Sequence, residues 1–174
     1  MRRLAALIFV SMIITAPVGA INIFEGNSEL GISGQIDVET LDGTVIEFDV
    51  LYGYFWVDFL EVGAHAGISD SDSFTTWRIG VFTEYHLFNE TPLVPFLGAS
   101  LDLSGSDIDL SVTDNSEDTA IIFGFQAGAK YFLTDSIAIK SQLSFDAATD
   151  DVFASDNRAE NTNWNVEFGL GFYY

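Results

Sequence analysis

Residues 120–132 read Ala-Ile-Ile-Phe-Gly-Phe-Gln-Ala-Gly-Ala-Lys-Tyr-Phe, and an apolar side chain stands at every second position. In an extended strand, Phe123 and Phe125 point to one face of the sheet, whereas Gly124 and Gln126 point to the other. Alternation with period two is typical of a β-strand that separates an apolar from a polar environment. This segment therefore predicts a sheet with two chemically different faces.

The same alternation recurs along the chain in seven further segments, residues 30–39, 45–56, 60–69, 76–87, 96–104, 137–147 and 163–174. No run of about 18 apolar residues follows residue 20, so no helical membrane span is expected. Asp42-Gly43 is a hairpin signal. Tight turns are expected after the second, fourth and sixth strands, and long polar loops at 105–118 and 148–161. This arrangement predicts an all-β chain, an eight-stranded antiparallel up-and-down transmembrane β-barrel.

The two faces of the predicted strands differ in charge and in side-chain size. The apolar face carries no Asp, Glu, Lys or Arg, as a surface in contact with lipid requires. The opposite face is rich in glycine, which suits the crowded interior of a narrow barrel, at Gly53, Gly63, Gly67, Gly80, Gly98, Gly124, Gly128, Gly169 and Gly171. A soluble exported barrel, with its apolar face turned inward, is the alternative.

Aromatic residues gather at the ends of the predicted strands. If both termini of the barrel lie in the periplasm, one group falls at the periplasmic ends, namely Tyr54, Trp56, Tyr85, Tyr131, Phe172 and Tyr174. Trp77 and Trp164 fall at the opposite ends. Two such belts are expected where a barrel crosses the two membrane–water interfaces.

Composition excludes several functions. The chain has 174 residues with 26 acidic and 6 basic ones, a net charge of −20 and a mean hydropathy of +0.27. Binding of nucleic acid requires clustered Lys and Arg, which are absent, so no nucleic-acid partner is expected. The chain contains no cysteine, which excludes disulfides, thiolate metal sites and a cysteine nucleophile.

The first twenty residues have the features of a secretory signal peptide. Arg2 and Arg3 precede an apolar run, and the small residues Val18-Gly19-Ala20 end it. We expect cleavage after Ala20 and a barrel domain that comprises residues 21–174.

Two segments resemble the porin-like and opacity-type family of small outer-membrane β-barrel domains. Residues 128–139 are similar to its sixth strand, turn and seventh strand, and residues 95–99 to its fifth strand. Residues 166–174 look like the C-terminal signal of outer-membrane barrels. The resemblance implies location in the bacterial outer-membrane bilayer and recognition by the barrel-assembly machinery through Phe168, Leu170, Phe172 and Tyr174. From the length of the chain we expect the mature protein to consist of the barrel alone.

Charged side chains are expected in the barrel lumen. Lys130 and Lys140 lie nearly equidistant from the turn at 134–136, so they should face each other, and a carboxylate is needed between them. Glu61, Glu84 or Glu167 is expected to supply it. The predicted lumen network comprises Glu47, Glu61, Arg78, Glu84, Lys130, Lys140 and Glu167, and we interpret it as structural. A solute pathway is the alternative.

The lumen is expected to be closed by its own side chains, because an eight-stranded barrel is only just wide enough for them. Phe55, Phe96, Phe132 and Tyr173 should close the periplasmic mouth, below an acidic bowl that includes Asp49, Asp102 and Asp146.

His65 and His86 also point inward, but neither stands in the His-x-Ser arrangement of lipid A deacylases, so no catalytic residue is predicted. No ligand-spaced motif predicts a metal site or a cofactor. The acidic loops are expected at most to bind divalent cations loosely.

These observations together predict a non-enzymatic outer-membrane protein of structural or surface-interaction type. Two alternatives of other classes stay open. The first is a narrow pore for small solutes, with a cation preference set by the acidic lumen. The second is a lipid-modifying enzyme that uses His65 or His86.

Overall fold

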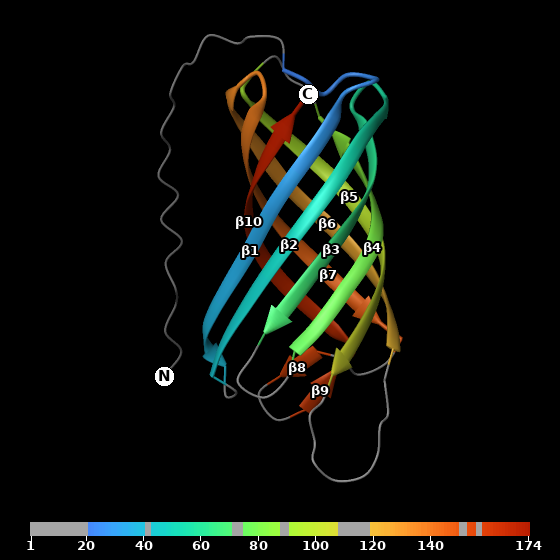
Figure 1. Cartoon of the computed structure of the whole chain (residues 1–174), viewed down its shortest axis with the longest axis vertical. Helices are drawn as coiled ribbons and strands as arrows, with labels where there is room; N and C mark the ends of the chain where they lie inside the picture. Colours follow the sequence, from blue (N-terminus) through green and yellow to red (C-terminus); the bar gives the residue numbers. More distant parts are fainter. Residues whose placement is uncertain are drawn as a thin grey trace.

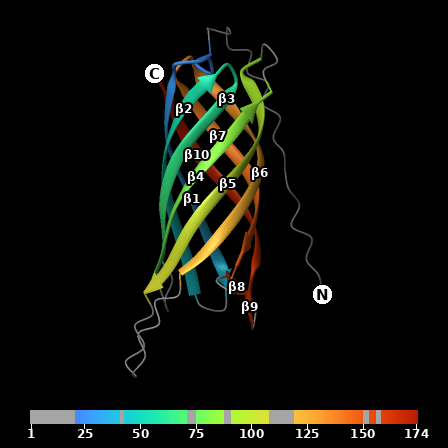
Figure 2. The same cartoon turned by 90° about the vertical axis from the view of Figure 1, so that its right-hand side faces the viewer.

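The computed structural model describes residues 21–40, 43–70, 75–87, 91–107, 119–149, 153–155 and 158–174. Its strands are β1 (Ser28–Thr40), β2 (Gly43–Val57), β3 (Leu60–Asp70), β4 (Thr75–His86), β5 (Leu93–Asp107), β6 (Thr119–Thr134), β7 (Ile137–Ala148), β8 (Phe153–Ser155), β9 (Arg158–Glu160) and β10 (Thr162–Tyr173). Eight of them form a closed barrel in the order β1-β10-β7-β6-β5-β4-β3-β2, in which all neighbours are antiparallel (Figures 1 and 2). The predicted eight-stranded barrel is confirmed.

The segment between β7 and β10 differs from the prediction. Where a long polar loop was expected at 148–161, β8 and β9 form a separate antiparallel hairpin. Each of these strands has three residues, too few for a period of two to be recognised in the sequence. The signal peptide at 1–20, Asp42 of the hairpin signal and most of the acidic loop residues lie outside the described residues.

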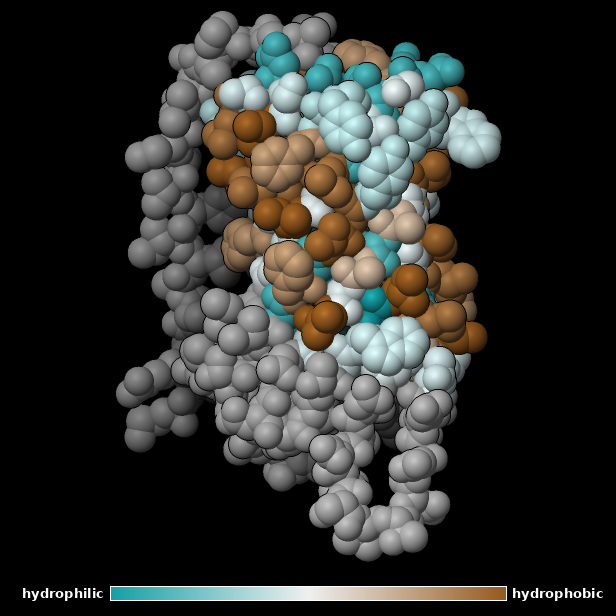
Figure 3. Space-filling view, viewed as in Figure 1, coloured by the Kyte–Doolittle hydropathy of each residue, from teal (hydrophilic) through white to brown (hydrophobic). Residues whose placement is uncertain are grey.

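The strands turn opposite faces to the outside and to the lumen. Large apolar side chains are exposed on the outer face, for example Phe125 at 62% and Phe168 at 61%. Figure 3 shows them as a broad apolar band across the middle of the molecule. The lumen contains the buried polar side chains, among them Glu61, Glu84 and Lys130. This distribution is the reverse of that in a soluble barrel.

Two of the connections at one end of the barrel are very short. Asp58 and Phe59 join β2 to β3, and Asp135 and Ser136 join β6 to β7. Phe59 has a φ of +67°. The C-terminus lies at the same end, at the top of Figure 1, whereas the β8–β9 hairpin lies at the other end. We call these the short-turn end and the hairpin end.

The ladder that closes the barrel is short. β1 and β10 are paired over six residue pairs, from Glu29–Tyr173 to Gly34–Phe168. By comparison, β5 and β6 are paired over thirteen, from Leu93–Tyr131 to Gly105–Thr119. Among the described residues, no helix is long and apolar enough to cross a membrane.

Candidate functional site

An apolar plug fills the lumen at the short-turn end. Its buried members are Ile21, Ile23, Phe55, Val94, Phe132, Ala138 and Tyr173, and Phe59 packs against them. Phe96 is buried next to this plug, against the His86 ring at a centroid distance of 5.9 Å. The four aromatic residues that the sequence places at this mouth are therefore all buried in the structure.

Residues 21–27 run across this mouth and supply two members of the plug. The backbone N–H of Phe59 donates to the Ile23 carbonyl at 3.0 Å, and that of Gly26 donates to the Phe55 carbonyl at 3.0 Å. Gly26 has a φ of +93°, a conformation that favours glycine. Ile23 is thereby completely buried. Two isolated apolar residues before the first strand have no periodicity that sequence analysis could have used.

A buried ionic cluster forms the next layer of the lumen. The Lys130 ammonium lies 2.6 Å from Glu29 Oε2, 3.1 Å from Glu61 Oε2 and 2.9 Å from Glu84 Oε2. The Lys140 ammonium lies 2.6 Å from Glu84 Oε1. Lys130 and Lys140 are direct partners in the β6–β7 ladder, so Glu84 of β4 binds both ammonium groups and offsets their repulsion.

Glu29 is a member of the cluster that sequence analysis missed. The predicted first strand began at residue 30, whereas β1 begins at Ser28 and turns the Glu29 side chain into the lumen. Residue 29 lies two positions before Gly31 and four before Ser33, on the same face of the strand. This alternation was the signal in the sequence that could have placed Glu29 in the lumen. Glu167, a predicted candidate for the cluster, instead accepts a hydrogen bond from Gln142 Nε2 at 2.8 Å.

Glycine makes room for the cluster at β2. A Cβ atom on Gly53 would lie 1.7 Å from Glu61 Oε1. Gly53 and Gly63 are paired across the β2–β3 ladder, so the space beside Glu61 is bounded by backbone that has no side chain. The glycines of the polar face thus provide volume for long side chains from neighbouring strands.

His86 borders the same cluster. Its Nε2 lies 3.7 Å from Glu61 Oε2 and 3.8 Å from Glu84 Oε2, and its Nδ1 lies 3.3 Å from the Phe59 carbonyl. Among the described residues, Glu61, Glu84 and His86 are the group whose donor atoms converge closely enough to hold a metal ion. The Lys130 ammonium already occupies the space between the two carboxylates, so these residues fit an ionic cluster better than a metal site.

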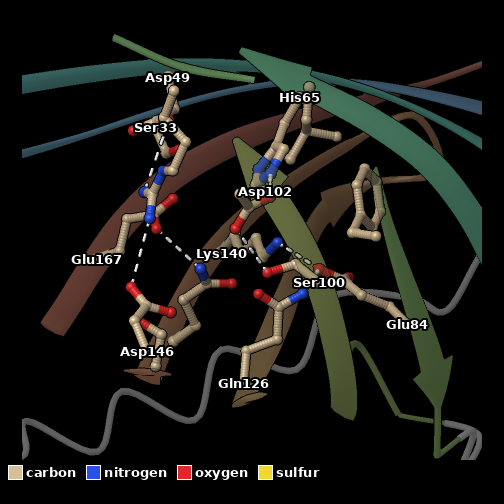
Figure 4. Close-up of a pocket in the computed structure, with 15 residues that line it drawn as sticks. Ser33, Asp49, His65, Glu84, Ser100, Asp102, Gln126, Lys140, Asp146 and Glu167 are labelled. Carbon is tan, nitrogen blue, oxygen red and sulfur yellow. Dashed lines mark hydrogen bonds and ion pairs between the residues drawn. The ribbon is translucent and has the colours of Figure 1, made fainter. Parts of the chain in front are cut away.

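A second polar layer lies further toward the hairpin end. The Arg78 guanidinium of β4 lies 3.3 Å from Asp146 of β7 and 3.9 Å from Asp49 of β2. His65 Nε2 is paired with Asp102 Oδ1, and Ser100 Oγ donates to Asp102 Oδ2 at 3.0 Å. Figure 4 shows the side chains of Asp49, His65, Asp102 and Asp146 extending from several strands into the same space. Of the predicted lumen network, Glu61, Glu84, Lys130 and Lys140 thus belong to the ionic cluster and Arg78 to the second layer.

A pocket lies between the two layers. Lys140 and Glu84 of the ionic cluster line it, as do Arg78, Asp49 and Asp146 of the second layer. The exposed fraction of the side chain is 24% for Arg78 and 1% for Glu84, so the pocket is more open on the side of the second layer. Glu47 is partly buried but does not line this pocket.

The predicted interface aromatics point outward. Seven of the eight are exposed, namely Tyr54, Trp56, Trp77, Tyr85, Trp164, Phe172 and Tyr174. Tyr131 is partly buried. Phe168 and Leu170 of the predicted assembly signal are also exposed on the outer face of β10.

No family model and no curated protein matches the sequence. Solved structures do match. Neisserial surface protein A (NspA) is 18% identical with a TM-score of 0.64, over 85% of this chain and 97% of that one. The N-terminal β-barrel domain of Pseudomonas aeruginosa OprF is 18% identical with a TM-score of 0.61, over 86% of this chain and 98% of that one.

A third match is the outer membrane protein OprG from Pseudomonas aeruginosa, 10% identical with a TM-score of 0.55, over 88% of this chain and 99% of that one. Identities this low show a common fold. The fold of this chain is that of the small eight-stranded outer-membrane β-barrels.

Proposed function

We propose that the protein is an integral outer-membrane barrel of structural or surface-interaction type, with a lumen that does not conduct. The observation that carries this proposal is the reversed distribution of polarity. Phe125 and Phe168 are exposed on the outer face, whereas Lys130 and Glu61 are buried inside. An outer surface of this kind is unfavourable in water and favourable in lipid, because moving apolar area out of water lowers the free energy.

Closure of the lumen favours a structural role over a pore. The apolar plug and the buried ionic cluster lie one above the other at the short-turn end. Ile23, Phe55 and Lys130 are each completely buried, so no water contacts them. An ion that crossed the lumen would have to displace both layers, and breaking a buried ion pair alone typically costs about 3–5 kcal/mol.

The orientation we propose places the short-turn end in the periplasm and the hairpin end outside the cell, as in barrels with short periplasmic turns. The outward aromatics would then lie at the two membrane interfaces, where Tyr and Trp are favoured. The signal peptide at 1–20, cleavage after Ala20, and recognition of Phe168, Leu170, Phe172 and Tyr174 by the assembly machinery belong to the same proposal.

The lumen histidines support a non-enzymatic role. The Ser100 hydroxyl donates to the Asp102 carboxylate and not to His65, so the imidazole is not placed to remove its proton. His86 is buried beneath the pocket between the plug and the ionic cluster. Loose binding of divalent cations to the acidic loops remains part of the proposal.

Insertion and conductance test this function separately. We expect the refolded mature chain to require detergent or lipid, and to migrate faster on a gel before boiling than after it. In planar bilayers it should produce no steady openings. Cation-selective openings would instead support the pore, and a chain that stays dissolved and folded without detergent would contradict membrane insertion altogether.

A further inference from the structure

The pocket between the two polar layers has an excess of acidic groups. Five carboxyl groups line it, those of Asp49, Glu84, Asp102, Asp146 and Glu167. Two basic side chains, Arg78 and Lys140, also line it, together with His65. The lining carries both signs, but carboxyl groups outnumber basic side chains, and low-dielectric walls focus the field of such an excess so that it concentrates ions of the opposite sign. The pocket is therefore electrostatically suited to a cation.

Among the described residues that line this pocket, two buried oxygens accept no hydrogen bond, Glu84 Oε2 and Gln142 Oε1; Glu84 Oε2 is ion-paired with the Lys130 ammonium at 2.9 Å, whereas Gln142 Oε1 has no such partner. Gln142 lines the pocket, is only 7% exposed, and its Oε1 accepts no hydrogen bond. The orientation of the amide follows from Glu167, because only the Nε2 side can donate to a carboxylate. An unpaired buried acceptor is unfavourable, so a hydrogen-bond donor is needed at Oε1.

The size of the pocket limits what that donor can be. Its cavity volume of about 30 Å³ has room for roughly two waters. A calcium or magnesium ion would need about six converging oxygen ligands. Within the described ranges, the donor group that converges closely is the one around Lys130 and not one around Gln142. A compact cation that donates hydrogen bonds fits better than a bare metal ion.

The pocket already contains an example of this chemistry. The Lys140 ammonium lies 2.6 Å from Glu84 Oε1 and 5.0 Å from the centre of the Phe96 ring. An ammonium group can donate to a carboxylate or an amide oxygen and contact an aromatic face. Phe96 does not itself line the pocket, but carboxylates, the Gln142 amide and the Phe82 ring do.

We propose that this pocket binds a primary ammonium group, which donates a hydrogen bond to Gln142 Oε1 and is attracted by the surrounding carboxylates. The group enters from the hairpin end, past Arg78. Ammonium ion and the end of a linear alkylamine have this chemistry in common. The site requires only the folded barrel, so it is independent of whether the lumen conducts.

Calorimetric titration of the refolded mature chain in detergent tests the site. The probes are ammonium, propylammonium and tetramethylammonium chlorides at constant ionic strength. Ammonium should bind saturably, whereas tetramethylammonium, which has the same charge but no N–H donor, should not. Binding of propylammonium would show that the site accepts the end of an alkylamine, and its absence would restrict the site to the free ion.

Two substitutions locate the binding. Gln142→Met removes the acceptor at similar length and should weaken ammonium binding about tenfold or more, since hydrogen bonds to charged groups are the stronger ones. Gln126→Met, the comparison variant, removes an amide that donates to Glu84 Oε1 at 3.0 Å but leaves the acceptor at Gln142, so it should weaken ammonium binding less than Gln142→Met does. Gel mobility before boiling verifies that each variant is folded. The proposal is overturned if ammonium does not bind, if tetramethylammonium binds equally, or if folded Gln142→Met binds as tightly as the parent.

Discussion

Replacement of Lys130 by methionine tests whether the buried ionic cluster holds the barrel together. The substitution keeps most of the aliphatic side chain and removes the ammonium group. Glu29 and Glu61 then lose their ammonium partner, whereas Glu84 keeps the Lys140 ammonium and the hydrogen bond from Gln126 Nε2. All three carboxyl groups are buried, so water cannot replace the lost contacts without opening the lumen.

The magnitude follows from the contacts. Lys130 donates hydrogen bonds to Glu29 and Glu61, and charge-assisted bonds each contribute about 1.5–3 kcal/mol. Their sum agrees with the roughly 3–5 kcal/mol that is lost when one partner of a buried ion pair is removed. We expect Lys130→Met to lower the free energy of unfolding by that amount.

Urea unfolding from lipid vesicles, followed by tryptophan fluorescence, measures this loss. Lys140→Met is the matched control, because among the described residues Lys140 forms an ion pair with Glu84 alone and its side chain is 8% exposed, and it should cost clearly less. A second substitution, Glu61→Gln in the Lys130→Met background, should recover part of the loss by removing one unpaired charge. Equal stability of Lys130→Met and the parent would refute the reasoning.

Three further substitutions probe other layers. Gly53→Ala places a Cβ 1.7 Å from Glu61 Oε1, so it should lower stability by about 1–3 kcal/mol in the same urea assay, as overpacking does. Phe125→Arg puts a charge on the outer face and should cost about 2–4 kcal/mol in lipid vesicles if that face contacts hydrocarbon, whereas an unchanged midpoint would contradict lipid contact. Ile23→Asp introduces a charge into the apolar plug; we expect flickering conductance in planar bilayers, and a silent, folded variant would indicate that the ionic cluster alone closes the lumen.

The fold was predictable because alternation specifies which face each residue occupies. Phe125 and Lys130 differ by an odd number of positions in one strand, so they must lie on opposite faces. The pairing of Lys130 with Lys140 followed from their nearly equal distance to a two-residue turn, and the register confirms it. Both inferences rest on alternation within a strand and on distance from a turn, and both quantities can be read from a single sequence.

The partners of the charged groups could be predicted only in part. Arg78 lies close to Asp146 and Asp49, which belong to strands that are not its neighbours in the barrel. Contacts across the lumen depend on strand tilt and on the shear of the barrel, which alternation does not determine. Glu29 was missed for a simpler reason, because strand boundaries are uncertain by a few residues in sequence analysis.

The short ladder between β1 and β10 suggests in which order the barrel closes. Hairpins such as β2–β3 join neighbouring segments, whereas the first and last strands must meet across the whole sequence, which is entropically the costliest step. Glu29 lies on this seam, paired with Tyr173, and it reaches Lys130 on the far wall, 101 residues away. The Glu29–Lys130 ion pair therefore stabilises the closure between β1 and β10 from inside the lumen. If this ion pair is broken, we expect β1 and β10 to separate before any other pair of neighbouring strands.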